Sequence, residues 1–475
     1  MSISPLMDIG ASALNAQQLA LDVTSGNITN ASTPGYSKET ALLSSSAPTT
    51  AYGLSVGSGV RVTTVQRSYD SFLQGQIVSE NSTSGQATTT NSTLQLVQSN
   101  FTDLTSSGLG TSLQGFFSAW QDLAANPQGS AERQEVLATG QSLADQFNQM
   151  SSSLTGVQDS LNQSLTGITS NVNNQLSQVA TLNGQILAVT AGGGQANTLS
   201  DQRDLLIQQL AQNVGITSAQ QSDGSISVSL SSGQALVTGV SAASLSLQAN
   251  AANSGYYDVM LTPPGGGVAV TATSFIGGPG NGQGNMGATL QLRDTTVKGY
   301  LSSLDELAST VVAQVNTAQA AGYGLTGSTG VNFFNAPATV TAANISVSIT
   351  SASDLAAADV DPTTGGTGNN INATAVANLY NKTNPMPIAG GAMTMANAYS
   401  ALVGKVGTDV QTAGQNQSQA DSMTSQLSNL RDSVSGVSLN EELSNLSQQQ
   451  QAFQAAAKLI TTGTQMLDTL MAMIT

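Results

Sequence analysis

The sequence contains no cysteine and no histidine. Without cysteine the chain can form no disulfide, no thiolate metal site and no cysteine nucleophile. Without histidine it lacks the commonest general base and the commonest metal ligand of proteins. These absences exclude most metalloenzymes and most hydrolases. The lack of cysteine also suits a protein that assembles outside the cell, where free thiols would cross-link, although low usage by chance would look the same.

Charged residues are scarce as well. They make up only 8% of the 475 residues, against roughly 25% in ordinary globular proteins. The net charge is −16, and the eleven Lys and Arg residues are scattered with no two adjacent. Nucleic acids and anionic lipid surfaces require clustered cations, so we expect neither a nucleic-acid partner nor a membrane partner. A surface of Ser, Thr, Asn and Gln suits dense packing against copies of the same chain.

No segment has the features of a cleaved leader or a membrane span. The first residues, MSISPLM, lack the basic and apolar regions of a secretory signal. No run reaches the roughly 18 consecutive apolar residues that a membrane helix needs. Export by a route without a cleaved signal peptide stays compatible with this pattern.

The two ends of the chain carry apolar residues at seven-residue spacing. Near the N-terminus these are Met7, Leu14, Leu21 and Ile28, and near the C-terminus they are Leu439, Leu446, Phe453, Ile460, Leu467 and Ile474. Heptad spacing predicts helices that pair along an apolar seam. Ser4 and Pro5 predict the start of the first helix, and Thr33-Pro34-Gly35-Tyr36 predicts the turn that ends it. Ser438 with Glu441 predicts a capping box for the last helix. A lone amphipathic helix cannot bury its stripe, so we expect both ends to order on assembly.

The middle of the chain alternates between helical and β-like patterns. Apolar residues step by three or four from Leu143 to Ile186, which predicts one long helix. Three glycines from Gly192 end it, and Thr198 with Asp201 predicts a capping box for the next helix. Alternating patterns such as Ile226-Val228-Leu230 predict short strands.

We therefore predict a mainly α protein with β inserts. Its helical bundle is discontinuous, built from N- and C-terminal segments, with coiled-coil-like terminal helices and small β-rich inserted domains. The predicted parts are terminal axial helices at 1–45 and 437–475, a helical bundle at 46–212, 286–322 and 395–436, a β-rich insert at 213–285, and a second β-rich or irregular insert at 323–394. The glycines after Met395 predict interruptions in the last bundle helix.

No residue pattern predicts catalysis or a bound cofactor. The tightest charge cluster, Asp201 with Arg203 and Asp204, is better explained as a structural ion pair in the bundle. Glu441 and Glu442 lie where a helix dipole favours acids. The glycine-rich stretch 277–284 lacks the Lys-Ser/Thr of a phosphate loop, and Trp120 with its neighbouring phenylalanines suits a core anchor. We predict no catalytic, metal-binding or cofactor-binding residue.

Several stretches resemble one family. Residues 27–37, NITNASTPGYS, are similar to a motif shared by flagellar rod, hook and junction proteins. Residues 120–127 (WQDLAANP), 182–186 (LNGQI) and 201–204 (DQRD) resemble the helical domain of the flagellar hook-associated protein 1 family. Residues 439–443 (LNEEL) and 466–470 (MLDTL) resemble the family's C-terminal motif. The chain departs from these motifs at Gly26, Gln319 and Phe453, where Asn, His and Tyr are usual.

The resemblance implies a structural protein of the bacterial flagellum. It would leave the cell through the flagellar type III export apparatus and form a ring at the distal end of the hook. Its partners would be copies of itself, the flagellar hook protein below, the second hook–filament junction protein above, and an export chaperone at the C-terminal region. The residues expected to contact neighbouring subunits are the ten heptad residues of the two ends together with Asn27, Asn30, Thr33, Pro34, Gly35 and Tyr36.

Other classes of protein fit less well. The second junction protein or a flagellin would lack the Trp120 and Asp201–Asp204 blocks in these positions. A secreted adhesin with a helical stalk would carry heptads along one continuous stalk rather than at both ends. A carboxylate-based glycosidase needs two carboxylates flanking a cleft, and the predicted β inserts contain few Glu residues.

Overall fold

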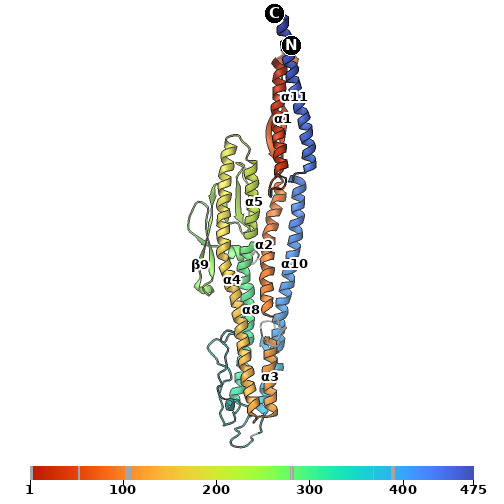
Figure 1. Cartoon of the computed structure of the whole chain (residues 1–475). Helices are drawn as coiled ribbons and strands as arrows, with labels where there is room; N and C mark the ends of the chain where they lie inside the picture. The colour runs from red at the N-terminus through yellow and green to blue at the C-terminus, as the bar shows by residue number, and fades with distance from the viewer. Residues whose placement is uncertain are drawn as a thin grey trace.

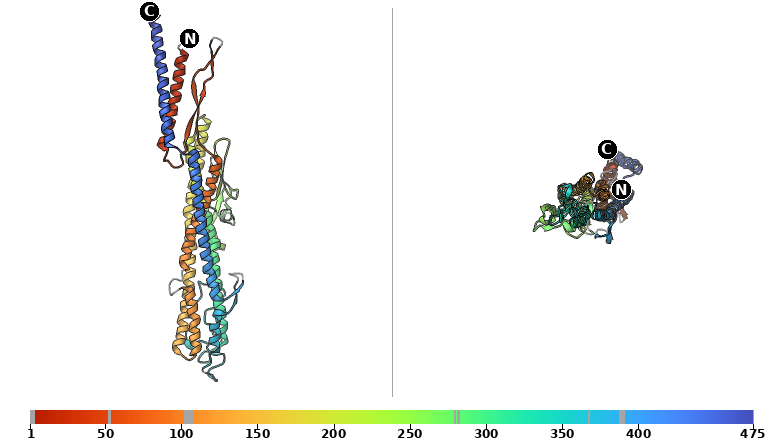
Figure 2. Two further views of the ribbon diagram at one scale, coloured as in Figure 1. Left: turned by 90° about the vertical axis from the view of Figure 1, so that its right-hand side faces the viewer. Right: turned by 90° about the horizontal axis from the view of Figure 1, so that it is seen from below.

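The computed structural model shows an elongated rod with both chain ends at the same tip (Figure 1). It describes residues 4–51, 54–101, 108–278, 280, 283–366, 368–386 and 391–474. The view from below shows how narrow the rod is (Figure 2). The predicted fold class is confirmed, because helices dominate and the sheets are small and antiparallel.

The terminal helices lie side by side and form the tip of the rod. They are α1 (Ser4–Asn30) and α11 (Leu439–Ile474), and we call them the axial pair. They run antiparallel, since each reaches the bundle at the end remote from the chain terminus (Figure 1). The predicted turn after α1 is present: Gly35 has φ +83° and the Tyr36 amide donates to the Thr33 carbonyl over 3.2 Å. Pairing within one chain therefore already gives each end a partner.

A long hairpin rises beside α1 (Figure 2). Strand β1 (Glu39–Ser45) pairs antiparallel with β4 (Val60–Arg67). The smaller pair β2 (Thr49–Ala51) and β3 (Leu54–Val56) extends it. We call this element the axial hairpin.

The bundle below the axial pair consists of long helices. They are α2 (Ser71–Asn100), α3 (Leu109–Ala125), α4 (Ser130–Ala191), α5 (Asn197–Asn213), α7 (Gly284–Gln291), α8 (Val297–Ala321) and α10 (Met395–Ser435). The apolar stripe predicted for the long helix lies on α4, and Leu143, Leu154 and Val172 are fully buried. Helix α4 has 62 residues, which gives a length of about 93 Å.

Aromatic residues pack the end of the bundle remote from the axial pair. Trp120 and Phe116 are fully buried, and both pack against Phe333 with ring centroids 6.1 and 5.2 Å away. Gly140 of α4 makes room for them, because a Cβ there would approach the Phe333 ring to 2.5 Å. The core-anchor interpretation of Trp120 is confirmed.

The first insert is a β domain on the flank of α4. One sheet has the order β5-β6-β7-β8 and the other β11-β10-β9. Their bounds are β5 (Ile216–Gln220), β6 (Ile226–Leu230), β7 (Ala235–Thr238), β8 (Ser241–Ala242), β9 (Ser244–Ala249), β10 (Tyr257–Thr262) and β11 (Val270–Thr271). The short helices η1 (Ala251–Asn253) and α6 (Thr273–Gly277) complete it.

A π-helical turn, η2 (Leu292–Thr296), joins α7 to α8 and buries Arg293 completely. Arg293 bonds Asp294 over 2.7 and 2.8 Å and the Asn162 side chain of α4 over 2.8 Å. Asn253 of the β domain donates to Asp294 over 2.9 Å. This network attaches the β domain to the bundle.

The segment between α8 and α10 is mostly irregular. Its regular elements are η3 (Ala352–Asp354), α9 (Ile371–Asn378), η4 (Leu379–Asn381), β12 (Asn384–Met386) and β13 (Gly391–Met393). The division of the chain into domains given above stays a prediction.

Two local predictions were wrong. Helix α5 begins at Asn197 without a side-chain cap, because the Asp201 carboxylate is used elsewhere, as described below. Helix α10 is continuous through Gly404, Gly407 and Gly414. Glycine costs a helix only about 1 kcal/mol, and packing against α2 outweighs that cost. Within the described residues, none of the helices combines the length and the apolar character that a membrane span requires.

Candidate functional site

Small residues bring α1 and α11 close together. Gly10, Ala16 and Ala20 of α1 are buried, as are Ala456 and Gly463 of α11. A Cβ at Gly463 would lie 3.3 Å from the side chain of a methionine on α1. Larger side chains of the opposite helix pack directly over the two glycines, so the helices approach each other closely there.

Asn27 is the polar centre of the axial pair. Its side chain is 1% exposed. The amide nitrogen donates to the Glu39 carbonyl over 2.8 Å and to Glu442 Oε2 over 3.0 Å. The amide oxygen accepts from the Glu39 backbone N–H over 2.9 Å and from the Tyr36 hydroxyl over 2.9 Å. Since an amide side chain has two donor and two acceptor positions, Asn27 has none left for another molecule.

Lys38 pairs with the two acidic residues at the start of α11. Its ammonium lies 3.0 Å from Glu441 and 3.5 Å from the buried Glu442. Burial acts to lower the pKa of Lys38, but bonding to Glu441 and the charge of Glu442 outweigh it and raise the pKa. The Lys38 backbone N–H donates to the Ser435 carbonyl over 2.7 Å. One residue thus binds both sides of the break between α10 and α11.

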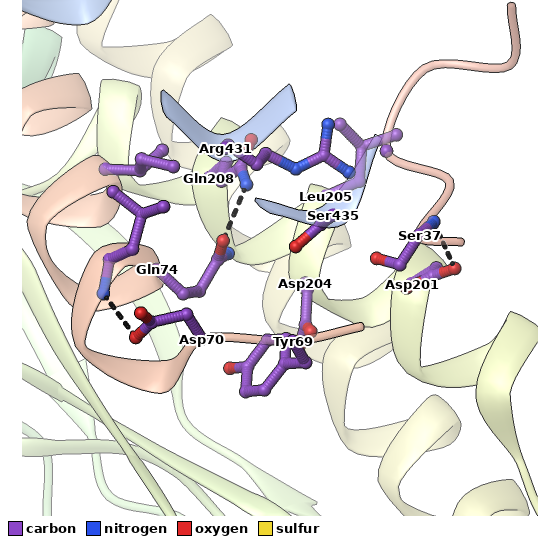
Figure 3. Close-up of a pocket in the computed structure, with 13 residues that line it drawn as sticks. Ser37, Tyr69, Asp70, Gln74, Asp201, Asp204, Leu205, Gln208, Arg431 and Ser435 are labelled. Atoms are coloured by element: carbon purple, nitrogen blue, oxygen red, sulfur yellow. Dashed lines mark hydrogen bonds between the residues drawn. The ribbon is translucent and has the colours of Figure 1, made fainter. Parts of the chain in front are cut away.

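A second ionic cluster fastens the axial hairpin to the bundle. Arg67, at the end of β4, bonds Asp201 and Asp204 of α5, each over 2.8 Å. Asp201 also accepts the Ser37 backbone N–H over 2.9 Å (Figure 3). Arg203 lies 3.5 Å from Asp204 and reaches the β domain, where it donates to a backbone carbonyl over 2.8 Å. The predicted structural ion pair exists, with Arg67 as its main cation.

Burial sets the protonation behaviour of this cluster. It raises the pKa of Asp204 against the opposing pull of Arg67 and Arg203. For Arg67, burial lowers the pKa, but the carboxylates of Asp204 and Asp201 outweigh it and raise the pKa overall. The charges of Arg67 and Arg203 therefore oppose the effect of burial on Asp204, so the carboxylate and its cations depend on one another.

The cluster borders a small cavity between α2, α5 and α10 (Figure 3). Its volume of about 20 Å³ is enough for about one water. Across it, Arg431 of α10 donates to the Tyr36 carbonyl over 3.0 Å. We call the region formed by residues 35–38, 67–70, 201–204 and 431–438 the joint.

The surface of α11 carries many large apolar residues that α1 does not cover. They are Leu439, Leu443, Leu459, Met466, Leu467, Leu470, Met471 and Met473. Exposed apolar residues gathered on one element in this way mark interaction surfaces. We call these residues the outer patch.

The structure separates the predicted contact residues into groups. Leu439 and Leu467 belong to the outer patch, whereas Leu446, Phe453 and Ile460 are half-buried at the edge of the α1 contact. The N-terminal heptad residues, Met7, Leu14, Leu21 and Ile28, are also half-buried. The side chain of Ile474 lies outside the described residues.

Most contacts that the structure shows for the predicted contact residues between 27 and 36 lie within the subunit. Asn27 is buried, Tyr36 bonds it, and Gly35 packs on Leu205 of α5, which a Cβ would approach to 3.2 Å. Asn30 bonds its own helix and Thr33, while Thr33 and Pro34 are exposed. Contact of any of these residues with neighbouring subunits stays a prediction.

Sequence reasoning missed Lys38, Glu39 and Arg67. A signal was present, since the chain has only eleven cations. The acidic pairs Asp201/Asp204 and Glu441/Glu442 each need a partner if they are buried, and Lys38 and Arg67 are two of these few cations. Among the described residues, no group of three or more acidic side chains could hold a metal ion.

A helical rod whose chain ends pair at one tip and expose an apolar patch is typical of a structural protein. The family model for the flagellar hook-associated protein FlgK helical domain matches residues 94–334. A model for the flagella basal body rod protein matches residues 7–36. A model for the C-terminal region of flagellar basal body rod FlgEFG proteins matches residues 432–473.

Whole-chain relatives agree with these matches. Flagellar hook-associated protein 1 of Bacillus subtilis is 30% identical over 96% of this chain and 95% of the relative. The Escherichia coli protein of the same name is 26% identical over 98% of this chain and 99% of the relative. The solved structure of the flagellar hook junction protein FlgK from Burkholderia pseudomallei has a TM-score of 0.68 at 16% identity and covers 76% of this chain and all of that one.

The chain therefore belongs to the flagellar hook-associated protein 1 (FlgK) family. It is a structural component of the flagellum at the hook–filament junction, not an enzyme, and it associates with other axial components. Family membership sets aside the adhesin, flagellin and glycosidase alternatives.

Proposed function

We propose that the chain forms a ring at the distal end of the hook, with the outer patch of α11 as its main subunit contact. The observation that carries this proposal is the exposure of the patch, because the contact with α1 leaves these apolar side chains uncovered. Leu443 is 53% exposed and Leu470 is 48% exposed. Fully burying an exposed leucine is worth roughly 1.5–3 kcal/mol, and about half of that remains to be gained at each of these half-exposed positions. A ring repeats that gain in every subunit.

The heptad residues at the edge of the α1 contact have a second role in this proposal. They would widen the contact around the patch, and they are Met7, Leu14, Leu21 and Ile28 on α1 with Leu446, Phe453 and Ile460 on α11. The flagellar hook protein would contact the ring from below and the second junction protein from above. The bundle and the β-rich inserts would form the outer part of each subunit.

Export without a cleaved signal peptide completes the proposal. A chaperone would cover the C-terminal region inside the cell and release it for export and assembly. The Met- and Leu-rich end of α11 suits such a partner, because flexible methionines adapt to more than one binding surface.

Location tests the proposal directly. Immunogold labelling of intact flagella should mark one narrow band at the distal end of the hook. Label along the filament, or label at the hook base, would contradict it. Cells lacking this chain should have hooks without filaments and should shed filament subunits into the medium.

A further inference from the structure

The axial pair and axial hairpin contain almost no apolar core. The hydrophobic clusters formed by the described residues include no residue of α1, β1, β4 or α11. In the described part of these elements, the only buried apolar side chains are Ala16, Ala20 and Ala456. Alanine buries little area, so apolar burial alone holds these elements together weakly.

Polar bonds between segments take the place of that core. Thr24 of α1 bonds Gln449 of α11 over 2.9 Å. Below this contact, Asn27 bonds Glu442 of α11 and both backbone groups of Glu39, the first residue of the hairpin. A single side chain of α1 therefore holds both α11 and the hairpin.

The Asn27–Glu39 contact resembles a strand pair. The side-chain amide exchanges one donor and one acceptor with the edge of β1, at 2.8 and 2.9 Å. Opening of the hairpin would leave Asn27 with unpaired buried groups, and so would departure of α11. A buried polar group without a partner is costly, so either loss weakens the other contact.

We propose that Asn27 is a latch that couples the pairing of the terminal helices to the seating of the axial hairpin, so that both order in one step. Glu442, Tyr36 and Lys38 are its supporting residues. The bundle has its own hydrophobic clusters and folds independently of the latch. This coupling concerns the single subunit and does not depend on the proposed ring.

Hydrogen exchange of the full-length chain tests the coupling. Asn27→Leu keeps the branched skeleton of the side chain but removes all four hydrogen bonds. We expect the amides of β1 and of the first turns of α11 to exchange at least about tenfold faster, together, because buried partners are left unpaired. The amides of α3, α4 and α8 should be unchanged. Asn15→Leu is the matched control, because Asn15 is exposed on the same helix, and it should leave both segments protected.

A compensating pair of substitutions separates a specific bond from general damage. Asn27→Asp alone places a second carboxylate against Glu442, and both segments should lose protection. Adding Glu442→Gln restores a donor opposite the new carboxylate at position 27, so the protection of α11, and with it that of β1, should recover in the double variant. Glu442→Gln alone gives the reference for that recovery.

Three results would overturn the proposal. The first is loss of protection in only one of the two segments in Asn27→Leu. The second is a double variant that exchanges as fast as Asn27→Asp alone. The third is free exchange of both segments in the unmodified subunit, because the latch would then not close before assembly.

Discussion

Gly10 of α1 faces Ile460 of α11 so closely that a Cβ at position 10 would lie 2.7 Å from Ile460 Cγ1. Real Cβ contacts are essentially never that short, so a larger residue forces the Ile460 side chain or the two helices to shift. The backbone at Gly10 is ordinary helix, which means that space, rather than a special conformation, requires glycine here.

We therefore predict that Gly10→Leu separates the axial pair. It should lower the helical circular dichroism of the subunit and leave the aromatic core around Trp120 unchanged. Gly26→Ala is the control on the same helix, because the nearest atom to its Cβ is 4.0 Å away. There the gain in helix propensity should stabilise α1 by up to about 1 kcal/mol. Equal effects of the two substitutions would contradict the close approach at Gly10.

Because the ion pair of the joint is buried, we expect Arg67→Met to lower the free energy of unfolding strongly. The side chains of Arg67, Asp201 and Asp204 are only 11%, 7% and 8% exposed. Removing this cation leaves two buried carboxylates without their main partner, which costs roughly 3–5 kcal/mol. Urea denaturation should show this loss, whereas Arg61→Met, at an exposed position of β4, should stay within about 0.5 kcal/mol of the parent.

The phenol of Tyr36 predicts alkaline opening of the axial hairpin. Burial, reinforced by Glu39, Asp201 and Glu442, raises its pKa to about 12 from the ordinary 10.0. The unfolded chain ionises first, so this contribution to stability is complete below pH 10.0 and is lost between 10.0 and about 12. Exchange of the β1 amides should accelerate across that window.

Tyr36→Phe isolates this titration from the others. Burial also raises the pKa of Tyr69 and of Tyr256 to about 12, so the whole subunit weakens in the same window. The β1 amides of Tyr36→Phe should lose only the part of the pH dependence that Tyr36 contributes. An unchanged pH profile in this variant would assign the effect to another group.

Substitutions in the outer patch should impair assembly without changing the stability of the subunit. Leu443→Gln with Leu470→Gln should change the unfolding free energy by less than about 1 kcal/mol, because both side chains are exposed. The junction should nevertheless fail, and cells should lose swimming motility. Leu96→Gln is matched in exposure, 54% against 53% for Leu443, but lies on α2 of the bundle, and cells with it should swim. If cells with the double variant swim normally, the outer patch of α11 is not the main subunit contact.

The periodicity of apolar residues in the sequence predicted much of the fold. The step of three or four from Leu143 to Ile186 predicted α4, and Thr33 to Tyr36 predicted the end of α1. Alternation around Val228 predicted the β domain. These predictions succeeded because each depends on neighbours within a few turns of the chain, where the pattern of apolar residues is decided by the element itself.

The roles of individual polar residues were not determined in this way. Asp201 had the position of a capping residue, yet it bonds Arg67 and Ser37, which lie 134 and 164 residues away in sequence. Asn27 was predicted to contact a neighbouring subunit, and the structure uses all of its polar positions within the chain. Which carboxylate meets which cation depends on how distant segments cross at the joint.

The sequence by itself thus determined that the protein is mainly helical with heptad ends, β inserts and no cysteine or histidine chemistry. Only the tertiary structure decided which face of α11 is inward. The heptad leucines identified an apolar helix, but Gly10, Gly463 and the alanines occupy the contact between α1 and α11, because two backbones can approach closely only over small side chains. That choice leaves the larger leucines outside, where another subunit can bury them.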